Sequence, residues 1–141
     1  MNLRNLEAMA DVARAHAAAE AAGDLDGTLA TLDPDPVYEL LPMGVTLRGG
    51  DFARAYYEHF FAQCMPQIVG YELRSEWVMD DGLGQEYRVD VDTPSGPRRH
   101  DILGILTFGD QGLLSGERLY ASDEFLRFLF GPLLPAPPGD D

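Results

Sequence analysis

The spacing of apolar positions changes once along this chain, from a helical repeat in the first half to an alternating repeat in the second. Up to about residue 66, apolar side chains recur every three or four residues, which is typical of helices that bury one face. Beyond that point they recur at every second residue, which is typical of strands. The pattern therefore predicts helices first and an antiparallel sheet after them.

The first helix is expected over residues 4–22. Alanines make up most of its apolar stripe, so it can lie close to the surface that it covers, and Gly23 is placed to end it. Asp24 is placed to cap a short second helix. Pro34 and Pro36 follow, and because proline has no backbone N–H, this helix is expected to stop before them.

A hairpin and a third helix complete the first half. Residues 37–41 and 45–48 are short apolar runs on either side of a Pro-Met-Gly turn, which predicts two paired strands. Asp51 then stands where an N-cap is expected, and the following aromatic-rich helix should run until Pro66.

Four alternating segments fill most of the second half. Short sequences rich in Gly, Asp and Pro separate them, which is typical of hairpin turns. An antiparallel meander is therefore expected, with the third segment in its middle because that segment is apolar on both faces. The predicted strands are residues 68–79, 84–93, 98–108 and 113–122.

The chain closes with a helix and a tail. A helix is expected to start at Ser122 or Asp123 and to bury its many Phe and Leu side chains. The proline-rich, acidic residues 132–141 favour neither helix nor strand, so a flexible tail is predicted. Residues 1–131 should then form one domain, which suits a chain of 141 residues.

Charge narrows the classes of partner. The sequence holds 24 acidic and 10 basic residues, for a formal net charge of −14. Phosphate backbones and anionic lipid surfaces would repel such a chain. We therefore expect neither nucleic-acid nor membrane binding.

The cysteine and apolar content of the chain bear on its cellular location. Cys64 is the only cysteine in the sequence, so it can form no disulfide within the chain and no thiolate cluster for a metal. The sequence shows no secretion signal at its start and no apolar run long enough to cross a bilayer. These features predict a cytoplasmic protein without a metal site.

One predicted strand carries candidate chemistry. In residues 86–92 charged and apolar side chains alternate, so Arg88 and Asp90 share one face and Tyr87, Val89 and Val91 share the other. If the charged face lines a cavity, Arg88 and Asp90 form an acid/base pair. If it faces water, they are ordinary surface charges, and the alternation alone favours this second interpretation.

Aromatic and histidine side chains offer further candidates. Tyr56, Phe60 and Trp77 could line a pocket for a ring-bearing ligand, although filling the core is the commoner role for such residues. His100 stands beside Asp101, but neighbours on a strand point to opposite faces, so a dyad is not expected. A structural or surface role fits His100 better.

Several short sequences, in their order, resemble a known family. They are a strand with a Pro-x-Gly turn at residues 38–44, an Arg-Gly-x-Asp followed by a helix at 47–57, and the strand residues 103–110 and 117–120. Together they resemble the SnoaL-like branch of the nuclear transport factor 2-like superfamily. The resemblance implies an α+β cone, in which a curved antiparallel sheet wraps around N-terminal helices and encloses an apolar pocket. It also implies a homodimer that pairs through the sheet.

Within that branch, Arg88-Val89-Asp90 resembles the Arg-x-Asp of limonene epoxide hydrolases, where the pair acts on the epoxide oxygen. Tyr38 matches the water-holding tyrosine of that group. Leu40 and Leu119 stand where that group has its water-positioning Asn and its basic Asp, so the water site is incomplete. Glu117, on the same predicted strand as Leu119, could supply a replacement carboxylate.

The resemblance also extends to polyketide cyclases, which move a proton beside a carbonyl with a pocket carboxylate. Because this chemistry needs no water site, we expect a cofactor-independent cyclase or isomerase acting on a small hydrophobic, polyketide- or terpenoid-like substrate. The alternatives are an epoxide hydrolase with a rebuilt water site and a non-catalytic binding or scaffolding domain. The expected catalytic residues are Asp90, Arg88, Tyr38 and Glu117. The residues expected to contact substrate are Tyr56, Phe60, Trp77, Leu40, Leu119 and His100.

Overall fold

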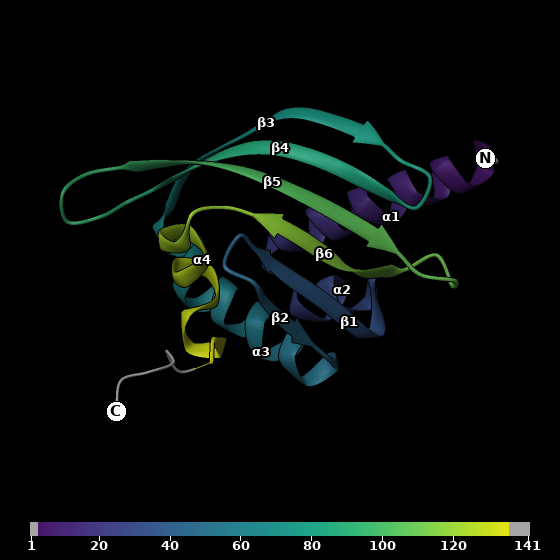
Figure 1. Cartoon of the computed structure of the whole chain (residues 1–141), viewed down its shortest axis with the longest axis horizontal. Helices are drawn as coiled ribbons and strands as arrows, with labels where there is room; N and C mark the ends of the chain where they lie inside the picture. Colours follow the sequence, from purple (N-terminus) through teal and green to yellow (C-terminus); the bar gives the residue numbers. More distant parts are fainter. Residues whose placement is uncertain (1–2, 136–141) are drawn as a thin grey trace.

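A curved sheet with helices gathered against one face makes up the fold (Figure 1). The computed structural model describes residues 3–135, with side chains from residue 6 onward. The helices are α1 (Leu3–Ala22), α2 (Leu25–Ala30), α3 (Gly50–His59) and α4 (Asp123–Phe130). The strands are β1 (Leu32–Leu41), β2 (Val45–Arg48), β3 (Ile68–Val78), β4 (Gly82–Val91), β5 (Arg98–Phe108) and β6 (Leu114–Tyr120).

The six strands form one open sheet in the order β2-β1-β6-β5-β4-β3. Strands β3 to β6 form the predicted antiparallel meander, and β5, apolar on both faces, lies between β4 and β6. The hairpin of β1 and β2 joins the meander because β1 pairs in parallel with β6. The α+β architecture with a curved antiparallel meander is thus confirmed.

The N-terminal helices begin and end as the sequence predicts. Helix α1 stops before Gly23, whose φ of 67° lies in the left-handed region that glycine tolerates. The Asp24 side chain accepts a hydrogen bond of 3.0 Å from the backbone N–H of Gly27, which caps α2.

Strand β1 starts five residues earlier than expected. Leu32 pairs with Leu114 of β6, and an irregularity in register separates that pair from the regular pairing that starts at Val37. The intervening prolines are tolerated because they fall in this irregular stretch. The Pro36 carbonyl still accepts a 2.9 Å hydrogen bond from the Gly49 N–H.

The prediction for the third helix was wrong at both ends. Gly49, rather than Asp51, occupies the N-cap position of α3, and Asp51 lies in the first turn. The helix does not run unbroken to Pro66, because it widens into a π-helical turn at Phe60–Cys64. A 3₁₀ turn, Met65–Gln67, then takes Pro66 at a position where its missing N–H costs nothing.

The core lies between the helices and the concave face of the sheet. Tyr57, Leu40, Ile102 and Leu126 are at most 2% exposed, and the Tyr56 and Phe130 rings stack at a centroid distance of 4.3 Å. Helix α4 supplies Phe130 and Leu126, so the closing helix is part of this core rather than an appendage.

The start of the predicted tail is ordered. Gly131–Leu133 forms a 3₁₀ turn, and Leu133 and Leu134 pack against the core. The prediction of a flexible tail from residue 132 was therefore wrong for this stretch, since these apolar side chains gain from burial. The remainder of that prediction, residues 136–141, lies outside the described residues.

Candidate functional site

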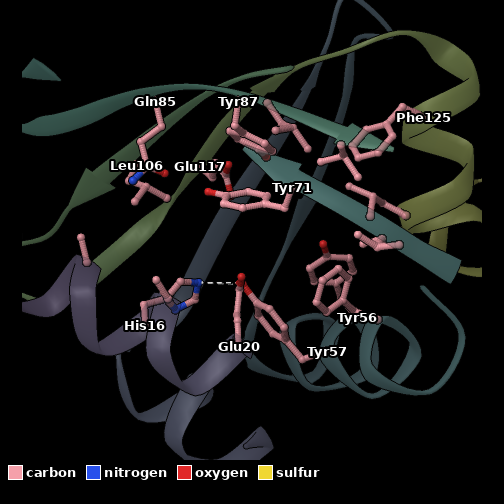
Figure 2. A pocket seen from close by; sticks show the side chains of 17 residues that line it. His16, Glu20, Tyr56, Tyr57, Tyr71, Gln85, Tyr87, Leu106, Glu117 and Phe125 are labelled. Atoms are coloured by element: carbon pink, nitrogen blue, oxygen red, sulfur yellow. Dashed lines mark hydrogen bonds and ion pairs between the residues drawn. The ribbon is translucent and has the colours of Figure 1, made fainter. Parts of the chain in front are cut away.

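A cavity of about 190 Å³ opens between helix α1, helix α3 and the concave face of the sheet (Figure 2). Most of its wall is apolar or aromatic, and a few polar side chains interrupt it. The polar and aromatic lining residues are His16, Glu20, Tyr56, Tyr57, Phe60, Tyr71, Gln85, Tyr87, Glu117 and Phe125. Such a wall, apolar with few polar groups, is typical of small-molecule sites.

Helix α1 contributes an ion pair to this wall. His16 and Glu20 are one helical turn apart, so they lie on the same face as Ala13 and Ala17, which also line the cavity. The His16 Nε2 lies 2.9 Å from Glu20 Oε1 (Figure 2). His16 is almost fully buried whereas the Glu20 side chain is 34% exposed, so the contact is shielded on the His16 side and borders solvent on the Glu20 side.

Thr31 fixes Nδ1 as a nitrogen of His16 that carries a proton. The Thr31 hydroxyl donates to the Thr28 carbonyl at 2.6 Å, so its oxygen is left to accept the proton of His16 Nδ1 at 2.7 Å. A neutral His16 would then present an unprotonated Nε2 to Glu20, and two acceptors would face each other. The contact is therefore consistent with an imidazolium paired with a carboxylate. Burial alone would lower the pKa of His16, but the hydrogen bond and charge of Glu20, the charge of Glu117 and a backbone hydrogen bond at Thr28 together outweigh it and raise that pKa.

Two tyrosines extend this network towards β1. The Tyr57 hydroxyl lies 3.3 Å from His16 Nε2 and 2.7 Å from the Tyr38 hydroxyl. Burial, foremost, raises the pKa of both phenols, so both stay protonated at neutral pH. The tyrosines thus anchor the His16 side of the cavity without adding charge.

Glu117 projects from β6 into the opposite side of the cavity, beside Tyr71 and Tyr87 (Figure 2). Gly104 on the neighbouring strand makes room for it, because a Cβ at that position would lie 2.6 Å from Glu117 Oε1. Glu117 keeps some exposed surface because it borders the cavity, yet protein encloses its carboxyl group on the other sides. This desolvation, with a smaller contribution from the Glu20 charge, raises the pKa of Glu117 to about 7.

The β3 and β4 side of the cavity is formed by Tyr71, Gln85 and Tyr87. Gln85 is held by a 2.7 Å hydrogen bond to Glu76 on β3. Tyr87 is partly buried and Tyr71 is 64% exposed, and burial raises the pKa of both phenols. Tyr71 therefore stands at the rim between the cavity and solvent.

Arg88 and Asp90 do not line the cavity, so the prediction that they form its acid/base pair was wrong. On β4 the cavity receives Gln85, Tyr87 and Val89, and strict alternation sends the residues between them to the outer face. There Arg88 contacts Asp101 at 2.7 Å and Asp90 contacts Arg99 at 3.1 Å. The interpretation of these residues as outer-face charges is the one that the structure supports.

The remaining predicted site residues divide into those that line the cavity, those buried behind its wall and those that lie elsewhere. Glu117, Tyr56, Phe60 and Leu119 line the cavity. Tyr38 and Leu40 are buried behind its wall, and Tyr38 contacts two lining residues, Tyr57 through a hydrogen bond and Tyr56 through its ring.

Two predicted substrate contacts lie elsewhere, and those predictions were wrong. Trp77 is 42% exposed and covers Gly84 on the outer face of the sheet. The His100 ring packs against Phe125 at 5.0 Å but is not part of the cavity wall. Burial lowers the pKa of His100, as expected for a structural histidine.

Sequence reasoning missed His16 and Glu20. A signal was available, because Ala13, His16, Ala17 and Glu20 follow the i, i+3, i+4, i+7 spacing of one helix face. That face also carries the predicted apolar stripe. Polar residues within such a stripe point towards the interior, and there they need partners.

Among residues 3–135, no group of three or more His, Cys, Asp or Glu side chains could hold a metal ion. In the same part of the chain, no helix is long and apolar enough to span a membrane.

Comparison with known proteins agrees with this architecture. A family model described as a SnoaL-like domain matches residues 13–115. A search of curated proteins found no significant match.

Solved structures with the same fold include several bacterial proteins. An NTF2-like protein of unknown function from Burkholderia xenovorans shares 22% identity and a TM-score of 0.65, over 95% of this chain and 91% of its own. One from Burkholderia pseudomallei shares 18% identity and a TM-score of 0.66, over 86% and 97%. A protein of ketosteroid isomerase-like fold from Catenulispora acidiphila, solved in complex with trimethylamine, shares 15% identity and a TM-score of 0.61, over 85% and 89%.

These likenesses to solved structures establish the fold, and the family match covers well over half of the sequence. Together with the curved sheet, the N-terminal helices and the enclosed cavity, they show that the chain belongs to the SnoaL-like family of the nuclear transport factor 2-like superfamily.

Proposed function

We propose that the protein catalyses proton transfer on a small hydrophobic carbonyl compound, with Glu117 as the group that takes and returns the proton. The observation that carries this proposal is the position of Glu117, whose carboxyl group projects into an aromatic cavity, where burial raises its pKa to about 7. A group of that pKa is both a usable base and a usable acid at neutral pH.

The step is the removal of a proton from a carbon next to the carbonyl. The ionised Glu117 accepts the proton, and the electron pair of the C–H bond moves to the carbonyl to form an enolate. Protonated tyrosines at the same wall, Tyr71 and Tyr87, are the available donors for the enolate oxygen. Return of the proton to a different carbon gives an isomer. Attack of the enolate carbon on a second carbonyl within the substrate closes a ring, and the alkoxide that forms at the second carbonyl takes the proton back from Glu117.

Hydrolysis of an epoxide fits the cavity less well. The Arg-x-Asp route requires Arg88 and Asp90 at the epoxide oxygen, and both lie on the outer face of the sheet. Glu117 could activate a water molecule, but the residues matching the water site are the apolar Leu40 and Leu119. The polar groups of the cavity therefore favour proton transfer over water addition.

Deuterium exchange tests the proposal without knowledge of the true substrate. A panel of cyclic ketones and β-dicarbonyl compounds is incubated with the protein in D₂O, and NMR follows deuterium at the carbon beside the carbonyl. For at least one compound, exchange should be accelerated, and the rate should rise as the pH passes through about 7 and Glu117 ionises.

The matched variants are Glu117→Gln and Glu86→Gln, the latter an exposed outer-face carboxylate. Loss of a general base typically costs about 10²- to 10⁴-fold in rate, so Glu117→Gln should be that much slower and Glu86→Gln unchanged. Equal rates in Glu117→Gln and the parent protein would contradict the role of Glu117. The absence of exchange with every ketone would instead favour a ligand-binding domain without turnover.

A further inference from the structure

We infer that the cavity binds small organic cations, specifically ligands that carry one positive charge on an alkylated nitrogen. This inference shares one element with the proposed function, because Glu117 faces the bound molecule in the cation site and in the proton-transfer reaction alike. It comes from the balance of charge in the cavity wall, from the aromatic rings that surround it and from its size.

The cavity wall has one more carboxylate than cation. Glu20 and Glu117 are its two acidic residues, and His16 is its only basic residue among the described lining residues. His16 is in contact with Glu20 at 2.9 Å, and its charge acts on Glu117 only from across the cavity. Among the described residues, no ion pair or hydrogen bond joins the ionised form of Glu117 to a cation.

None of the other described lining residues supplies the missing charge. The side chains that face the cavity from α3 are Tyr56 and Tyr57, followed by Phe60 of the π-helical turn. Those from β3 and β4 are Ile68, Tyr71, Gln85, Tyr87 and Val89. Their phenols stay protonated at neutral pH because burial raises their pKa values. A ligand with a single positive charge would thus restore neutrality inside the cavity.

The aromatic walls favour an alkylated nitrogen over a metal ion or a bare ammonium. The electron-rich faces of Tyr and Phe rings attract organic cations. Rings enter this cavity from α3, β3, β4 and α4, so they surround the space on several sides (Figure 2). Methyl groups on the nitrogen suit such walls because they bury apolar surface while the charge stays within reach of Glu117.

Size restricts the ligand further. A volume of about 190 Å³ is below the range of about 300 to 1,000 Å³ that is common for drug-sized ligands. A trimethylammonium group with a short substituent is the kind of molecule that such a space accommodates. The exposed Tyr71 at the rim leaves a route for that substituent towards solvent.

Proton linkage gives the inference a distinctive signature. A bound cation favours the ionised carboxylate, so it lowers the pKa of Glu117 and binding below that pKa releases a proton. Affinity should therefore rise with pH up to about 7 and level off above it. The bound charge would also hold Glu117 in the basic form that proton abstraction requires.

The experiment compares choline with 3,3-dimethyl-1-butanol, its uncharged carbon analogue of the same shape. Calorimetry and protein NMR measure the affinity of the full chain for each at pH 5.5 and pH 8, at one fixed ionic strength. Choline should bind at least tenfold more tightly than the alcohol at pH 8, and the advantage should shrink at pH 5.5. Equal affinities, a choline affinity independent of pH, or no binding of choline would each overturn the inference.

Variants test whether choline binding and its pH dependence arise in the cavity. Glu117→Gln should remove the pH dependence and weaken choline binding at pH 8, whereas Glu86→Gln on the outer face should leave both unchanged. Tyr71→Leu should weaken binding by about two- to fivefold and Tyr71→Phe should not, since only leucine removes the ring. Because Tyr71 is exposed, this second pair tests the inference even if a change at Glu117 unfolds the protein. A wild-type choline affinity in both Glu117→Gln and Tyr71→Leu would overturn it.

The two proposals fail separately. Deuterium exchange that depends on Glu117 without choline binding would reject the cation site and leave proton transfer standing. Choline binding that depends on Glu117, without deuterium exchange of any ketone, would reject proton transfer and leave the cation site standing.

Discussion

His16 and Glu117 both bind protons more strongly in the folded protein than in an unfolded chain. For each, the folded pKa lies above the ordinary value, through Glu20 for His16 and through desolvation for Glu117. A raised folded pKa means that the native state holds more protons, so both groups make stability fall as pH rises. For Glu117 the fall spans its ordinary value of 4.5 to about 7 and is complete above that.

Glu117→Gln should therefore gain stability relative to the parent protein between pH 5 and pH 8. The gain should be at most on the order of 3 kcal/mol, because glutamine has no buried charge to form. Denaturant unfolding of both proteins at the two pH values measures it, and Glu86→Gln should show no such gain. A stability difference that does not change with pH would mean that the pKa of Glu117 is not raised.

Thr31 permits a second test at the scale of single residues, this time of the hydrogen bond to His16. Thr31→Val keeps the shape of the side chain but removes the acceptor for His16 Nδ1, which leaves a buried donor unsatisfied. The free energy of unfolding should fall by about 1 to 3 kcal/mol, and the NMR titration of His16 should move to lower pH. Thr46→Val, at an exposed position of β2, is the control, and an equal effect of both changes would contradict the role of Thr31.

Residue-level prediction from the sequence succeeded where the chemistry was local. Alternation correctly paired Arg88 and Asp90 on one face of β4, but alternation cannot say which face is concave. The partners of Arg88 and Asp90 lie on β5, and the spacing of residues within β4 carries no information about them. Glu117 was identified through the resemblance, whereas His16 shares a helix face with Glu20 that the spacing shows but needs Thr31 as a partner, which only the folded chain brings close.

At the scale of elements, the close approach of α1 to the cavity depends on its alanines. Ala17 lines the cavity, whereas its exposed neighbour Ala18 does not. Ala17→Leu should therefore obstruct the cavity and weaken ligand binding at least tenfold, with little change in stability because both positions are exposed. Ala18→Leu, an equal change one residue away, should bind normally.

Ligand titration by NMR, with thermal unfolding as a check on folding, measures this prediction. Equal affinities of Ala17→Leu and Ala18→Leu would show that ligands do not occupy the part of the cavity next to α1.

Element boundaries were predictable where a cap or a turn defined them. Gly23, Asp24 and Ser122 end or begin helices as expected, since their backbone or side chain satisfies the helix terminus. The extension of β1 to Leu32 was not predictable, because it depends on pairing with a strand some eighty residues away. The π-helical turn after α3 likewise interrupts a sequence pattern that is continuous.

On the scale of the whole molecule, the outer face of the sheet lies opposite the helices (Figure 1). Leu103, Ile105, Trp77 and Tyr120 are partly or largely exposed on that face, alongside the ion pairs of β4 and β5. Apolar residues rimmed by charges are typical of a protein interface. We therefore retain the proposal of a homodimer that pairs through this face.

Analytical ultracentrifugation tests that proposal. The parent protein should sediment with twice the mass of the chain, and Ile105→Arg should sediment as a monomer because it places a charge in the centre of the face. Ala18→Arg, an exposed change on α1, should remain dimeric. A parent protein that is monomeric at high concentration would refute the proposal.

The position of Tyr71 has a practical consequence. It belongs to β3, which ends the sheet, pairs only with β4 and shows two irregularities in its register. Strands of this kind open locally more often than interior strands such as β5, so their amide hydrogens exchange faster with solvent. A ligand held against Tyr71 would slow exchange along β3 and leave β5 unchanged. Hydrogen–deuterium exchange at β3 can thus report occupancy of the cavity for any compound, before a substrate or a reaction is known.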